Sequence, residues 1–112
     1  MFKLIMHIEQ AHALGQAEAI RRIKHFGEEL QRKELPAGVV LKEVNTVWQG
    51  NEMTFSFTAK KGFFGATVTG VMVVADDLVV MDAVLPGILT AFMPEAKIRA
   101  ELQGELARLL AG

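Results

Sequence analysis

Three histidines are the side chains best suited to acid–base or metal chemistry in this chain of 112 residues. No two of His7, His12 and His25 have the spacing of a zinc motif such as H-E-x-x-H on a helix. They also fall on a predicted strand, a predicted loop and a predicted helix. We therefore expect ordinary surface or boundary histidines, and no metal site.

The other candidates for chemistry are equally isolated. Ser56 is the only serine, and it lies within a predicted strand rather than on the sharp strand-to-helix turn that exposes a nucleophile. Asp76 and Asp77 are adjacent carboxylates, but neighbouring aspartates between two strands are typical of a solvated turn. Cysteine is absent, which removes thiolate ligands and thiol nucleophiles. The sequence thus predicts no enzyme and no cofactor.

Composition limits the partners. The chain has 12 Lys and Arg against 13 Asp and Glu, and a nucleic-acid binder normally carries a basic excess. Hydrophobic residues make up 51% and charged residues 22%, which favours a packed fold over disorder. We expect a single domain over residues 1–112, in the cytoplasm, without nucleic acid.

The very apolar segment 71–93 raises the question of a membrane span. Asp76, Asp77 and Asp82 interrupt it, and Pro86-Gly87 breaks it again, so no uncharged stretch of about 18 residues remains. The segment is better interpreted as a hairpin, and no transmembrane segment is expected.

The elements that must position these side chains follow from the hydrophobic period. Alternation over Phe2–Glu9 predicts a strand, and steps of three and four over Gln16–Lys33 predict a helix that Pro36-Ala-Gly38 ends. The sequence predicts an α+β fold of two layers, with helices on one face of an antiparallel sheet and the order β-α-β-β-β-β-α. It leaves open where the first strand lies in the sheet. The remaining predicted features are four strands over Val39–Leu85, turns at Gly50-Asn51, Lys60-Lys61-Gly62 and Asp76-Asp77, and a second helix from Pro94.

The turns fix which side chains share a face of the sheet. A turn at Gly50-Asn51 sets Trp48 opposite Met53, Thr46 opposite Phe55 and Val44 opposite Phe57. An apolar cavity between this face and the second helix would make the protein a small-ligand-binding module, similar to a reduced helix-grip fold. The residues expected to line such a cavity are Trp48, Phe55, Phe57, Met72 and Met81.

The opposite face of the last hairpin is unusually apolar for a surface that only water covers. It carries Val71, Val73, Val80 and Val84, with Thr67, Thr69 and Asp82 among them. Either this face is covered by a partner, a homodimer above all, or the valines reflect β-propensity and stand in the open. We favour the partner surface.

A third group of apolar residues lies in the connection Leu85–Met93, which contains no charge. Packing under the second helix is the expectation for such a group in a globular protein. The alternative is that Ile88, Leu89 and Phe92 face a lipid or polymer surface.

Two motifs resemble a known family. The segment His12-Ala-Leu-Gly15-Gln-Ala-Glu18-Ala-Ile-Arg-Arg22 is similar to the H-x-L-G-x-x-E-A-x-x-R stretch of small bacterial polyhydroxyalkanoic acid system proteins. The segment from Trp48 to Ser56 is similar to the W-x-G-x-x-x-x-F-S hairpin of that family. The resemblance covers nearly the whole chain and implies a role at or near polyester storage granules. It brings no catalytic residues, so it too points to a surface.

Overall fold

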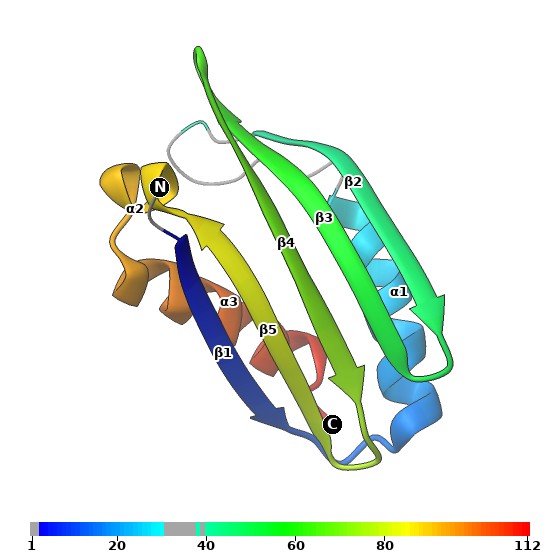
Figure 1. Ribbon diagram of the computed structural model, residues 1–112. Helices are drawn as coiled ribbons and strands as arrows, with labels where there is room; N and C mark the ends of the chain where they lie inside the picture. Colours follow the sequence, from blue (N-terminus) through cyan, green and yellow to red (C-terminus); the bar gives the residue numbers. More distant parts are fainter. Residues whose placement is uncertain (1–2, 31–37, 39) are drawn as a thin grey trace.

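The computed structural model describes residues 3–30, 38 and 40–112. A five-stranded antiparallel sheet forms one layer, and the helices form a second layer on one face of it (Figure 1). The predicted α+β architecture is therefore confirmed. The elements are β1 (Lys3–Ala11), α1 (Gln16–Leu30), β2 (Val40–Gln49), β3 (Glu52–Lys61), β4 (Phe64–Val74), β5 (Leu78–Pro86), α2 (Gly87–Phe92) and α3 (Glu95–Leu109).

The position of the first strand, which the sequence left open, is at an edge. The strand order is β1-β5-β4-β3-β2, so β1 lies beside the last strand of the hairpin series. Its free edge is covered by α3, where Arg99 donates a hydrogen bond to the carbonyl of His7 at 2.6 Å and Gln103 donates one to the carbonyl of Glu9 at 2.8 Å. These side chains satisfy carbonyls that another strand would otherwise pair with.

Two of the three predicted turns are confirmed, and one is displaced. Pairing of Gln49 with Glu52 confirms the turn at Gly50-Asn51, and pairing of Val74 with Val79 confirms the turn at Asp76-Asp77. The predicted turn at Lys60-Lys61-Gly62 is wrong, because it lies further along the chain. Lys61 pairs with Phe64, and the turn is Gly62-Phe63. Gly62 has φ +62°, which suits the first position of a tight hairpin turn. Phe63 therefore stands at the tip.

Trp48 pairs with Met53 and Thr46 with Phe55, as predicted, whereas Val44 shares the position opposite Phe57 with Glu43. Lys42 pairs with Thr58 and Asn45 with Ser56, which leaves two residues of β2 opposite Phe57 alone. This β-bulge places Glu43 at φ +55° and shifts the register beyond it.

Three predicted boundaries fall wholly or partly outside the described residues. The helix predicted over Gln16–Lys33 is seen as α1 up to Leu30, and its predicted end at Lys33 and at Pro36-Ala37 lies outside them. The same holds for Phe2 and Val39, where the first and second strands were predicted to begin. The predicted connection after Leu85 contains the short helix α2. Its six residues are too few for a helical hydrophobic period to be recognised in the sequence.

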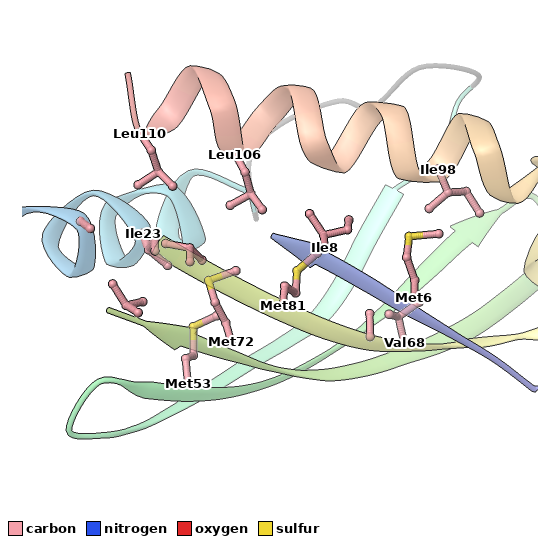
Figure 2. Close-up of a cluster of buried hydrophobic side chains, with 14 of the residues drawn as sticks. Met6, Ile8, Ile23, Met53, Val68, Met72, Met81, Ile98, Leu106 and Leu110 are labelled. Carbon is pink, nitrogen blue, oxygen red and sulfur yellow. The ribbon is translucent and has the colours of Figure 1, made fainter. Parts of the chain in front are cut away.

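The core lies between the sheet and the helices, as Figure 2 shows. Met6 and Ile8 of β1 and Met81 of β5 point toward Ile98 and Leu106 of α3. On the same face, Gly70 of β4 pairs with Phe55 of β3, and a Cβ atom at Gly70 would lie 2.4 Å from the Phe55 Cζ atom. The Phe55 ring thus occupies the space that a side chain at Gly70 would need.

Candidate functional site

The face of the sheet that points away from the helices is here named the open face (Figure 1). Burial along β4 and β5 alternates residue by residue, so every second side chain leaves the core. The open face carries Ile5, His7 and Glu9 from β1; Val80, Asp82 and Val84 from β5; Thr67, Thr69, Val71 and Val73 from β4; Glu52, Thr54, Ser56 and Thr58 from β3; and Lys42, Asn45, Val47 and Gln49 from β2.

Five aliphatic residues of three adjacent strands form what we name the aliphatic patch of the open face. Ile5 pairs with Val84, and Val80 pairs with Val73, so methyl groups adjoin across β1, β5 and β4. Ile5 is 70% exposed and Val73 is 37% exposed, whereas the other three are half-buried. The four predicted surface valines all belong to the patch, which consists of Ile5, Val71, Val73, Val80 and Val84.

Hydroxyl side chains lie directly beside the aliphatic patch. Thr69 pairs with Val84 on one side and with Ser56 on the other, and Val71 pairs with Thr54. The neighbouring Thr58 and Thr67 hydroxyl oxygens are 3.4 Å apart. This hydroxyl block of β3 and β4 supplies hydrogen-bond donors without charge.

A cluster of His7, Glu9 and Asp82 interrupts the aliphatic patch. The His7 Nδ1 atom is 2.6 Å from the Asp82 carboxylate, and its Nε2 atom is 2.8 Å from the Glu9 carboxylate. Hydrogen bonds to Glu9 first and to Asp82 second raise the pKa of His7, since both favour the imidazolium form. With both ring nitrogens bonded to carboxylates, neither is left to take a proton from a substrate.

The sequence could have indicated half of this cluster. His7 and Glu9 are two positions apart on a predicted strand, and that spacing places them on one face. Asp82 comes from β5, and its position beside His7 depends on where β1 enters the sheet. Hydrophobic periodicity does not determine which strand lies beside β1, so Asp82 could not be predicted as a neighbour of His7.

The raised pKa of His7 gives a pH dependence that NMR can measure. We expect the His7 imidazole to titrate above its ordinary value of 6.5, with Glu9→Gln lowering the midpoint more than Asp82→Asn. Because the folded pKa exceeds the unfolded one, the stability that this cluster adds is complete below pH 6.5 and is lost as the pH rises through the folded pKa.

The matched control is Glu52→Gln, which removes a carboxylate from the same face but from strand β3. It is expected to leave the His7 midpoint unchanged. A wild-type midpoint at or below 6.5 would contradict the cluster.

The other two histidines lie elsewhere. The His12 Nδ1 atom accepts a hydrogen bond from the Leu14 N–H at 3.2 Å, so the proton is on Nε2, which donates to the Ala75 carbonyl at 3.0 Å. His25 lies on α1, with Nε2 3.0 Å from the Glu29 carboxylate. Within residues 3–30, 38 and 40–112, no group of three or more His, Asp or Glu side chains is placed to hold a metal ion.

The first resemblance motif has a structural explanation. Gly15 precedes α1 at φ +81°, and Glu18 forms ion pairs with Arg21 and Arg22. Hydrogen bonds from these two guanidinium groups, Arg21 first, lower the pKa of Glu18 to about 2. Arg22 also donates to the Leu109 and Ala111 carbonyls at the end of α3, at 3.2 and 2.6 Å. The motif thus joins α1 to α3.

The five residues predicted to line a cavity lie on the core side of the sheet. Met72 and Met81 are buried there, and Trp48, Phe55 and Phe57 pack against the core from its rim. The Phe55 and Phe57 rings stack with centroids 6.2 Å apart, and the Lys24 ammonium lies 5.2 Å from the centroid of the Trp48 ring. Their role as cavity lining stays a prediction.

The Leu85–Met93 connection divides its apolar residues between core and surface. Leu89 and Met93 pack against the core, whereas Ile88 is 47% exposed. The Phe92 side chain lies outside the described part of the structure. None of the helices described is long and apolar enough to cross a membrane.

The fold and the open face together define a class of protein: an α+β sheet protein that presents one broad, partly aliphatic sheet face. The chain matches the family model described as "Putative polyhydroxyalkanoic acid system protein" over residues 6–110. The chain therefore belongs to this family, which confirms the resemblance found in the sequence. Comparison with curated proteins and with solved structures gave no match.

Proposed function

We propose that the protein acts in the polyhydroxyalkanoate system without catalysis, by binding the polyester surface of a granule through its open face. Membership of the family supports the pathway. The engagement of both His7 ring nitrogens supports a role in contact rather than in acid–base chemistry. The observation that carries the proposal is the aliphatic patch beside the hydroxyl block.

The chemistry of the open face suits a polyester. A polyhydroxyalkanoate offers alkyl groups and ester carbonyls, which accept hydrogen bonds but donate none and carry no charge. Val71 and Val73 offer methyl groups, and Thr54 and Thr69 offer hydroxyl donors in the adjoining register positions. Burying each exposed aliphatic side chain contributes about 25 cal/mol per Å² of apolar area.

Co-sedimentation with lipid-free polyhydroxybutyrate particles tests the proposal. We expect the wild type to sediment with the particles, and the double variant Val71→Lys/Val73→Lys to bind at least about tenfold more weakly, because each lysine places an ammonium against an uncharged polymer. The matched control is Ala107→Lys, which adds a charge on the exposed side of α3. It is expected to bind like the wild type.

A second copy of the chain is the other occupant that the open face could take, as the sequence suggested. Light scattering of the wild type and of Val73→Lys distinguishes the two. A dimer that this substitution converts to a monomer would assign the face to a homodimer and overturn the polyester proposal. Equal sedimentation of wild type and double variant would overturn it as well.

A further inference from the structure

The tip of the β3–β4 hairpin carries a phenylalanine that the described part of the chain leaves uncovered. Phe63 is 106% exposed, and Phe64 beside it is 53% exposed. The hairpin projects past the other elements at the end of the sheet where α2 lies, as Figure 1 shows at the top of the view. Exposing a phenylalanine on a projecting turn loses the stabilisation that its burial would give, so the position calls for an explanation.

Two lysines immediately precede the turn. Lys60 and Lys61 are exposed, and the hairpin end from residue 59 to 66 contains no acidic residue. The whole chain has a net charge of −1, so the positive charge of this tip is local and is not a property of the protein as a whole. The Lys60 side chain lies against its cross-strand partner Gly65, where its Cγ atom would be 3.6 Å from an added Cβ atom.

The apolar character of the tip continues onto α2. Ile88 is 47% exposed and, with Leu89, lines a shallow hollow of about 40 Å³ beside the strand residues that flank the β3–β4 turn. Ala59, Ala66 and Phe64 complete the apolar part of this lining. A hollow of that size is far below the few hundred Å³ that a small-molecule ligand needs, so this hollow is not a site for such a ligand.

We propose that the β3–β4 hairpin tip inserts Phe63 into the surface of an anionic phospholipid layer, with Lys60 and Lys61 held at the headgroups. Aromatic side chains favour the boundary between headgroups and acyl chains, and lysines near an anionic surface add attraction that salt screens. An uncharged polyester would give the lysines no partner, so the tip is expected to bind a different ligand from the aliphatic patch. The proposal therefore stands whether or not the open face binds polymer.

Flotation with vesicles of phosphatidylglycerol and phosphatidylcholine tests the tip. We expect the wild type to float with these vesicles at low salt and Phe63→Ser to bind about tenfold more weakly. Neutralising one lysine, in Lys60→Gln or Lys61→Gln, is expected to weaken binding about fivefold. Vesicles of phosphatidylcholine alone are expected to bind much less.

Val71→Lys/Val73→Lys is the control, since it alters the open face and leaves the tip intact. It is expected to float like the wild type, and Phe63→Ser is expected to sediment with lipid-free polyester like the wild type. Failure of the wild type to float, or equal flotation of Phe63→Ser, would overturn the proposal. Because Phe63 is wholly exposed, the thermal midpoint of Phe63→Ser should match the wild type, which excludes unfolding as a cause.

Discussion

Replacement of Gly70 by alanine is expected to lower the free energy of unfolding by about 3 kcal/mol. The added Cβ atom would lie 2.4 Å from the Phe55 Cζ atom and 2.6 Å from the Asp82 carbonyl oxygen. The ring can move, but the carbonyl belongs to the backbone of β5, an interior strand, so the sheet itself must shift. Chemical denaturation of the purified variant measures the change.

Gly65→Ala is the matched control, on the same strand β4. There the nearest atoms to an added Cβ are 3.6 to 3.7 Å away, which is ordinary contact, and alanine is expected to change stability by less than about 0.5 kcal/mol. Trimming the ring, in Phe55→Leu/Gly70→Ala, should recover only part of the loss, because the carbonyl remains in place. A Gly70→Ala protein as stable as wild type would show that β4 and β5 are not packed this closely.

Replacement of His12 by alanine is the second large effect, with an expected loss of about 2 kcal/mol. It leaves the Leu14 N–H and the Ala75 carbonyl, both part-buried, without their imidazole partner. The backbone N–H of His12 still donates to the Asp77 carbonyl at 3.0 Å, so the loop keeps its position and loses only the side-chain bonds. Thermal unfolding followed by circular dichroism measures the loss.

His25→Ala provides the comparison, because His25 is an exposed residue of α1 whose ring contacts only the Glu29 carboxylate among the described bonds. Its removal is expected to change stability by less than about 0.5 kcal/mol. Similar losses for the two variants would argue that His12 is no more structural than a surface histidine.

Periodicity was sufficient for the architecture. The strict alternation of β4 and β5 placed Val71, Val73, Val80 and Val84 on one face, and the structure has them there. The half-buried state of Val71, Val80 and Val84 follows from the same pattern, because neighbouring strands shield each valine from the side. What binds this face is a property of the partner, which periodicity in one chain does not encode.

The local backbone geometry of the bulge and of one turn could not be predicted from the sequence. The bulge at Glu43 adds one residue to β2, and no propensity distinguishes that residue from its neighbours. Likewise, Lys60 and Lys61 were predicted to form the turn. They pair with β4 instead, and the turn consists of Gly62, which has a positive φ, and Phe63 at the tip. Phe63, the most exposed aromatic side chain among the residues described, was therefore missed at the sequence level.

The pairing of β1 with β5 and its hydrogen bonds to α3 affect the order in which the chain can fold during synthesis. Its partner strand β5 and the Arg99 and Gln103 side chains along its edge all follow it by more than sixty residues, with separations of 92 and 94 for the two hydrogen bonds. The hairpins from β2 to β5 close locally and can form as they leave the ribosome. Strand β1 must then wait for helix α3, which is synthesised after it, and until α3 emerges a ribosome-bound chain keeps one β-edge open to chaperones or to a neighbouring nascent chain.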